Sequence, residues 1–209
     1  AYETAAQFSP QHLIAAIGPT GLPLDPTSAV SLKQSKKQYH DAVLALTQYP
    51  FDALYFTGFK SLDDAQCALM GARAVYDGPV FISLAPNGEG MFPGGRSLSE
   101  GVALCDEYGA DVIGVVSDAP AHVLVGFAKE MASATDKPLL VDASVRRKDR
   151  RQFEPTDENP YPTADAVVEL AVRLRAQGVQ FLRASGAATP AYTGALLATV
   201  GGGDVVAPQ

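Results

Sequence analysis

The segment Asp111-Val-Ile-Gly-Val-Val116 is a short apolar run that ends in the polar pair Ser117-Asp118 and gives way to a helical pattern. Continuous apolar runs are typical of strands buried on both faces of a parallel sheet. Such runs alternating with helices predict an α/β fold built from strand–helix units. The chain contains five further runs of this kind, at residues 12–17, 53–56, 79–84, 138–141 and 179–182.

Size and composition are those of one soluble globular domain. The 209 residues are 47% hydrophobic and 19% charged, which is enough to build one core. The net charge of −7 argues against nucleic-acid binding, because phosphate contacts need a basic surface. No apolar stretch approaches the ~20 residues of a membrane span, and residues 1–10 lack the layout of a signal peptide. We expect one domain over residues 1–209, a frayed tail at 200–209, and a cytoplasmic location.

The cysteines and histidines are spread along the chain. Cys67 and Cys105 fall within helical patterns beside Ala and Leu, which favours small buried hydrophobes over a disulfide or metal ligands. His12 precedes the first run, His40 lies within a helical pattern, and His122 begins another. We expect all three histidines to be structural or exposed rather than catalytic.

Helix signals follow the runs. Ser61 with Asp64 and Ser97 with Glu100 resemble capping boxes, and Gly109 is a predicted C-cap. The loop 86–96 contains four glycines, so we expect it to be mobile or closely approached by other atoms. The predicted helices lie at residues 31–47, 61–76, 97–108, 122–134, 163–178 and 191–199.

Ligands of parallel α/β folds bind where the strands end. The residues after the six runs are small or polar and include no His and no Cys. We therefore expect any ligand to contact small and hydroxyl-bearing groups at this edge. The substrate-binding candidates are Thr57, Gly58, Gly95, Ser117, Asp118, Asp142, Ser185 and Gly186.

Asp118 and Asp142 follow neighbouring strands in the predicted order. They are a candidate carboxylate pair for Mg²⁺ or for acid–base chemistry. The alternative is that each aspartate caps the helix that follows its strand.

Residues 146–151 place five of the sixteen basic residues in six positions. One interpretation is an anion site for a phosphate, a polyglutamate tail or an acidic partner. The other is a solvated loop whose charges repel one another. The anion-binding candidates are Arg146, Arg147, Arg150 and Arg151.

The order of the loops resembles the homocysteine S-methyltransferase family. The matching pieces are collinear over residues 13–199: Ala16-Ile-Gly-Pro-Thr-Gly21, Tyr39, Phe59-Lys-Ser-Leu-Asp-Asp-Ala65, Gly94-Gly-Arg-Ser-Leu-Ser-Glu100, Asp111-Val-Ile-Gly-Val-Val116, and Ala188-Thr-Pro190 with Ala195-Leu196. The resemblance implies a (β/α)₈ barrel of the TIM type. On this alignment the chain begins near the family's third strand, which implies an incomplete barrel with about six βα units.

The resemblance also implies where a metal is missing. In the family, Zn²⁺ held by three thiolates deprotonates the homocysteine thiol. The first thiolate position is Ser117 here, and the pair falls on Ser185 and Gly186, or on Ala184 and Ser185. The acidic residue that anchors the substrate amine is Thr57 here. Because a serine hydroxyl does not replace a thiolate toward zinc, we expect no zinc and no other cofactor.

These departures predict a degenerate, zinc-less binding or scaffolding subunit of a methyl-transfer system, with a small-molecule ligand. The alternatives are a zinc-independent methyltransferase acting on a small thiol or amine, and a barrel enzyme acting on a phosphorylated small molecule. An incomplete barrel exposes strand edges and apolar core. We therefore expect a second copy or a partner chain to complete it, and neither nucleic acid nor membrane as a partner.

Overall fold

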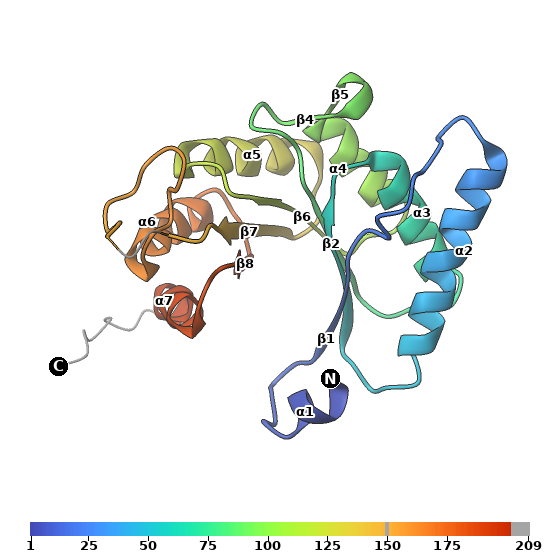
Figure 1. The fold of residues 1–209 in the computed structure, drawn as a ribbon, viewed down its shortest axis with the longest axis horizontal. Helices are drawn as coiled ribbons and strands as arrows, with labels where there is room; N and C mark the ends of the chain where they lie inside the picture. Colours follow the sequence, from blue (N-terminus) through green and yellow to red (C-terminus); the bar gives the residue numbers. More distant parts are fainter. Residues whose placement is uncertain (149–150, 202–209) are drawn as a thin grey trace.

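The computed structural model of the chain describes residues 1–148 and 151–201. Its main sheet has six parallel strands in the order β1-β2-β3-β6-β7-β8, so β1 and β8 are the edges. The sheet curls into a half-barrel with helices on its convex side (Figure 1). The strands are β1 (Ile14–Ile17), β2 (Ala53–Phe59), β3 (Val80–Leu84), β6 (Val112–Ser117), β7 (Leu139–Val145) and β8 (Phe181–Gly186).

A long helix follows each strand of the half-barrel, as the strand–helix units predict. A short helix that the sequence did not predict, α1 (Tyr2–Ala6), lies beside the β1 edge (Figure 1). No helix of the described chain has both the length and the apolar character needed to cross a membrane. The long helices are α2 (Ala29–Leu46), α3 (Leu62–Arg73), α4 (Leu98–Glu107), α5 (Ala121–Ala134), α6 (Ala164–Arg175) and α7 (Pro190–Gly201).

Successive side chains of each strand point to opposite faces of the sheet. The main core includes Phe56, Ile82 and Val115, which are fully buried on the convex side with side chains of the helices. A separate group of Tyr55, Val112 and Leu140, with Phe81 beside it, lies on the concave side. Burial of each large apolar side chain contributes about 1.5–3 kcal/mol, so the convex core supplies most of the stability.

The six predicted strands are all present, but three of them end three or four residues later than predicted. β2 ends at Phe59, β7 at Val145 and β8 at Gly186. Polar residues such as Asp142 and Arg183 continue the ladder, where they pair across β7 and β8. They do not end the strands because their side chains lie on the concave side, which is not covered by helices.

The helix caps formed largely as predicted. The Ser97 hydroxyl accepts the Glu100 N–H and the Glu100 carboxylate accepts the Ser97 N–H, which completes a capping box at α4. The Ser61 hydroxyl caps α3 by accepting the Asp64 N–H, but the Asp64 carboxylate bonds to α2 instead of closing the box. Gly109, with φ +83°, follows the end of α4.

The glycine-rich loop 86–96 is not an irregular segment. It forms an antiparallel hairpin of β4 (Met91–Phe92) and β5 (Arg96–Ser97), joined by the 3₁₀ turn Pro93–Gly95. The Asn87 side chain accepts hydrogen bonds from the N–H groups of Glu89 and Met91. These bonds stabilise the turn at residues 87–91, which leads into β4. The expected close approach occurs at Gly90, where a Cβ would lie 3.4 Å from the Phe127 ring.

Tyr39, on α2, contacts the loop after β1, the helix α3 and the strand β2. Its hydroxyl donates to Asp64 Oδ2 on α3 at 2.9 Å and accepts the Thr20 N–H at 3.1 Å. Its ring, which is 1% exposed, packs against Phe56 and Phe59. One hydroxyl group therefore fixes the loop after β1 and the contact between α2 and α3.

We expect Tyr39→Phe to lower the free energy of unfolding by about 1–3 kcal/mol, because both the Asp64 carboxylate and the Thr20 N–H lose a partner. Urea denaturation measures the change. Tyr49→Phe is the control, since Tyr49 is 49% exposed and its hydroxyl makes no hydrogen bond within the described residues. Equal effects of the two substitutions would contradict the role of the Tyr39 hydroxyl.

Candidate functional site

Polar side chains gather on the concave side of the sheet, toward the carboxyl ends of four strands. We call this group the concave polar cluster. An aromatic contact between Phe81 and Phe181, with ring centroids 5.0 Å apart, lies two residues before it along β3 and β8. The cluster consists of Tyr55 and Thr57 on β2, Ser83 on β3, Asp142 on β7, and Arg183 and Ser185 on β8.

An ion pair lies at the centre of the cluster. Arg183 Nη1 donates to Asp142 Oδ2 at 2.7 Å, and the guanidinium lies over the Tyr55 ring, 5.3 Å from its centroid. The Asp142 side chain is fully buried, whereas that of Arg183 is 45% exposed. Burial raises the pKa of Asp142 because it disfavours the charged form, and the neighbouring Ser185 hydroxyl and Arg183 guanidinium offset this only in part.

A chain of hydroxyl groups borders the ion pair. The Tyr55 hydroxyl and Ser83 Oγ are 2.8 Å apart, and Ser83 Oγ donates to Thr57 Oγ1 at 3.3 Å. Burial and the nearby Asp142 carboxylate raise the pKa of Tyr55, which keeps it a neutral phenol. The cluster therefore offers one cation, one buried carboxylate and several hydroxyls that both donate and accept hydrogen bonds.

Two of the predicted glycines shape the backbone of the cluster. Gly58, with φ +84°, lies at a bulge where the register of β2 and β3 shifts between Thr57 and Phe59. The extra residue leaves Thr57 in the cluster and turns Phe59 into the convex core. At Gly186, with φ +68°, a Cβ would lie 2.5 Å from the Val145 carbonyl oxygen, so a side chain there would separate β8 from β7.

The structure brings three predicted side chains together and separates three other candidates. Thr57, Asp142 and Ser185 belong to the cluster, with Gly58 and Gly186 in its backbone. Gly95 lies in the turn of the β4–β5 hairpin. Ser117 and Asp118 make hydrogen bonds outside the cluster.

Ser117 does not face the concave side. It pairs in register with Ala143, which lies in the convex core, and its hydroxyl accepts the Ala119 N–H at 3.1 Å. Asp118 accepts from Arg146 Nε at 2.6 Å. The predicted pair of Asp118 and Asp142 is therefore not formed, because each carboxylate has its own arginine.

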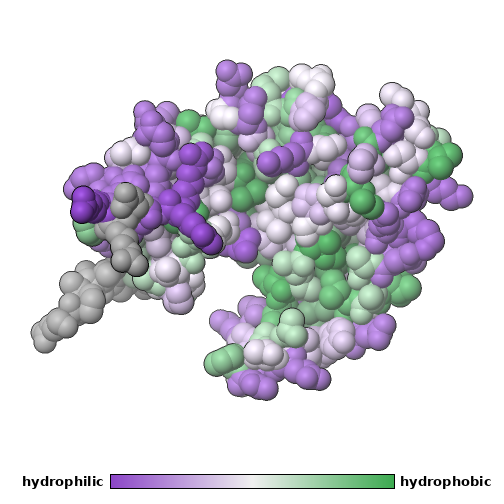
Figure 2. Space-filling view, in the orientation of Figure 1, coloured by the Kyte–Doolittle hydropathy of each residue, from purple (hydrophilic) through white to green (hydrophobic). Residues whose placement is uncertain are grey.

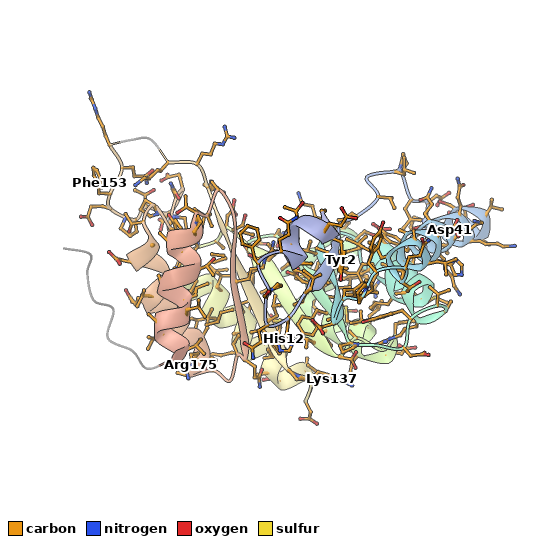
Figure 3. All side chains as sticks on the ribbon, turned by 90° about the horizontal axis from the view of Figure 1, so that it is seen from below. Tyr2, His12, Asp41, Lys137, Phe153 and Arg175 are labelled. Carbon is orange, nitrogen blue, oxygen red and sulfur yellow. The ribbon has the colours of Figure 1, made fainter. Side chains whose placement is uncertain are left out.

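The described residues 146–148 of the basic loop follow the carboxyl end of β7. Arg146 binds Asp118 and also donates to the Glu158 carbonyl at 2.7 Å, while Lys148 lies over the Phe153 ring. In Figure 3, Phe153 is at the end of the half-barrel opposite to Lys137 and His12. Arg146 thus helps to hold the loop in place. An anion site at Arg147 and Arg151 stays a prediction, and Arg150 lies outside the described residues.

Sequence reasoning missed Tyr55, Ser83 and Arg183 because they lie within or just after apolar runs rather than at the expected strand ends. A signal was present nonetheless. Tyr55 and Thr57, like Arg183 and Ser185, are two residues apart and therefore on one face of a strand. A polar pair at this spacing beside an apolar run indicates a polar patch on one face.

The described residues do not supply a zinc site. Cys67 and Cys105 are buried in α3 and α4, as predicted, and burial raises the pKa of the Cys105 thiol to about 12. The histidines are dispersed: His12 lies near Asp52, and His40 and His122 lie on different helices. Within residues 1–148 and 151–201, no three His, Cys, Asp or Glu side chains are grouped to hold a metal.

The comparisons with known proteins agree with this architecture. The family model described as homocysteine S-methyltransferase matches residues 1–202, while no curated protein sequence matches the chain. The apo form of the homocysteine methyltransferase MmuM from Escherichia coli has a TM-score of 0.70 at 16% identity, covering 94% of this chain and 65% of that one. The metallated form gives 0.70 at 17% identity, with the same coverage.

A more distant likeness is to N-acetylneuraminate lyase from Mycoplasma synoviae, with a TM-score of 0.57 at 12% identity, covering 91% of this chain and 60% of that one. Identities this low show the fold alone. The chain spans 65% of the length of the MmuM structures, which fits an incomplete TIM-type barrel.

Replacing Asp142 by Asn tests the electrostatics of the site. The pKa of Asp142 is raised above its ordinary 3.8, so its contribution to stability is fully present below pH 3.8 and is lost as the pH rises through the raised value. We expect the unfolding free energy of Asp142→Asn, relative to the unsubstituted chain, to increase over that window. Urea denaturation at a series of pH values measures it.

Glu100→Gln is the control of opposite sign, because the hydrogen bonds from Ser97 lower the pKa of Glu100. Its stability relative to the unsubstituted chain should fall as the pH rises through that lowered pKa. A relative stability of Asp142→Asn that also falls with rising pH would mean that Arg183 outweighs burial.

Proposed function

The chain belongs to the homocysteine S-methyltransferase family, and on that premise we propose that it is a binding or scaffolding subunit of a methyl-transfer system that works without the family's zinc. The observation that carries this proposal is the donor set at the strand ends. The resemblance of the loops places Ser117 and Ser185 where the family has thiolates, and the Ser117 hydroxyl is used in the turn before α5. Neutral hydroxyls are weak zinc ligands, so these residues do not fit the metal.

The contacts of the concave polar cluster also argue against a homocysteine site of the family type. Thr57, at the position of the family's acidic residue, is hydrogen-bonded to Ser83 and offers no carboxylate to an amine. The Asp142 carboxylate is buried and binds Arg183. We infer that the ligand of this protein contacts the ion pair and hydroxyls of the cluster rather than a metal-bound thiolate.

The two edges of the half-barrel support a partner. The strands β6 and β7 are largely buried, whereas Ile14 on β1 and Phe181 on β8 are 44% and 38% exposed. A cavity of about 560 Å³ lies between α1 and β1 and is lined mainly by apolar residues. Figure 2 shows the face hollowed between the two edges, with hydrophobic residues over β1. We propose that a second copy or a partner chain covers this surface.

We expect the purified chain to self-associate in sedimentation experiments. Ile14→Lys should weaken the association by adding a charge to the β1 edge. Leu44→Lys is the matched control, because Leu44 is 49% exposed on α2 and does not line the cavity between α1 and β1. A monomer at every concentration, or equal effects of the two substitutions, would contradict a second copy at the edges.

Elemental analysis with homocysteine titration tests the zinc-free function. We expect no stoichiometric zinc in the purified protein and weak or absent homocysteine binding. Ser117→Cys alone should not create a site, because one thiolate does not hold the metal. One tightly held zinc per chain, with homocysteine binding that disappears on chelation, would overturn the proposal.

A further inference from the structure

Arg183 is the cation of the concave polar cluster, and its hydrogen-bonding capacity is not used up within the protein. A guanidinium has five N–H donors in a planar fork. In the described structure, the bond to Asp142 comes from Nη1, and 45% of the Arg183 side chain is exposed. The charged group is therefore available to a molecule that enters the concave side.

The surrounding residues hold this guanidinium in one orientation. Asp142 binds it from β7, and the Tyr55 ring on β2 lies against it at 5.3 Å. Asp142 is also incompletely satisfied, because Oδ1 is buried without a hydrogen-bond partner in the described residues. A buried acceptor without a donor is unfavourable because the hydrogen bonds it made to water are not replaced. The site thus holds a positioned cation beside an acceptor that lacks a donor.

We propose that Arg183 and its neighbours bind a small 2-hydroxy monocarboxylate, which carries a neutral hydroxyl group next to its carboxyl group. The inference rests on the proposed function, since it names the ligand class of the same site. The ligand carboxylate binds the guanidinium, whose fork matches two carboxylate oxygens. Its hydroxyl hydrogen-bonds the polar side chains around Asp142.

The local charge favours a monoanion over a phosphate. Asp142 offsets part of the charge of Arg183, and Arg146, at the end of β7, is engaged by Asp118. The two negative charges of a phosphate would therefore be matched only by Arg183, whose own charge is partly neutralised by Asp142. The ring pair of Phe81 and Phe181, deeper along the same strands, suits a short apolar substituent on the ligand.

Nuclear magnetic resonance titration of the ¹⁵N-labelled full chain with glycolate tests the proposal. We expect saturable shifts of the Arg183 side-chain Nε–H signal. Acetate, which lacks the hydroxyl, and glycolamide, which lacks the charge, should both bind more weakly than glycolate. Inorganic phosphate serves as the dianion and should also bind more weakly.

Substitutions locate the site, and glycolate binding to each variant is measured by the shifts of the backbone amide signals. Arg183→Gln should weaken glycolate binding about tenfold or more, because charged hydrogen bonds are lost. Arg173→Gln is the matched control, since Arg173 is 42% exposed and paired with Glu169 on α6. If Arg183→Gln unfolds because Asp142 is left unpaired, the double variant Arg183→Gln with Asp142→Asn removes both charges, and Arg183→Lys keeps the charge without the fork.

The glycolate measurements and the zinc measurement test different proposals. Absence of saturable glycolate binding in the unsubstituted chain, unchanged binding in a folded Arg183 variant, or tighter binding of phosphate would each overturn the carboxylate site. None of these results changes the metal content, on which the zinc-free function depends. A zinc-bearing protein with an intact glycolate site would overturn only the proposed function.

Discussion

The alternation of side chains along six parallel strands is the constraint on which the rest of this structure depends. Because neighbours on a strand point to opposite faces, one set of residues builds the core with the helices and the other is left to the concave side. Phe56 and Ile82 belong to the first set, and Tyr55 and Ser83 to the second. The convex core and the concave polar cluster are thus built by different residues of the same strands.

That separation explains how much the sequence predicted. Apolar runs and caps depend on local patterns, so the six strands, the long helices and the Ser97–Glu100 box were predictable. The hairpin at 91–97 was not, because its strands are two residues each and the segment that leads into it is held by side-chain bonds of Asn87 that composition does not reveal. Strand ends were misjudged for a related reason. A polar residue such as Asp142 ends an apolar run in the sequence, yet it continues the ladder when its partner is Arg183 on the next strand.

The candidate site was predictable only in part, because a site joins residues distant in the chain. The rule that ligands bind at strand ends selected Thr57, Asp142 and Ser185, which the structure places in the concave polar cluster. The rule could not exclude Ser117, because a shift of one residue along the strand decides which side of the sheet it faces. It could not exclude Asp118 either, because its partner Arg146 lies 28 positions later in the chain. The parity of a residue along its strand decides which side it faces, and that parity becomes certain only when the paired strand is known.

The polar cluster carries an energetic cost that the convex core has to offset. A buried carboxylate with one unpaired oxygen, an arginine half withdrawn from water and a buried phenol are each less favourable than well-packed apolar side chains would be. The ion pair joins β7 to β8, but a well-packed apolar contact at the same place would do so at a lower cost. The concentration of these polar groups at the carboxyl ends of four strands supports our proposal that the site recognises a polar ligand.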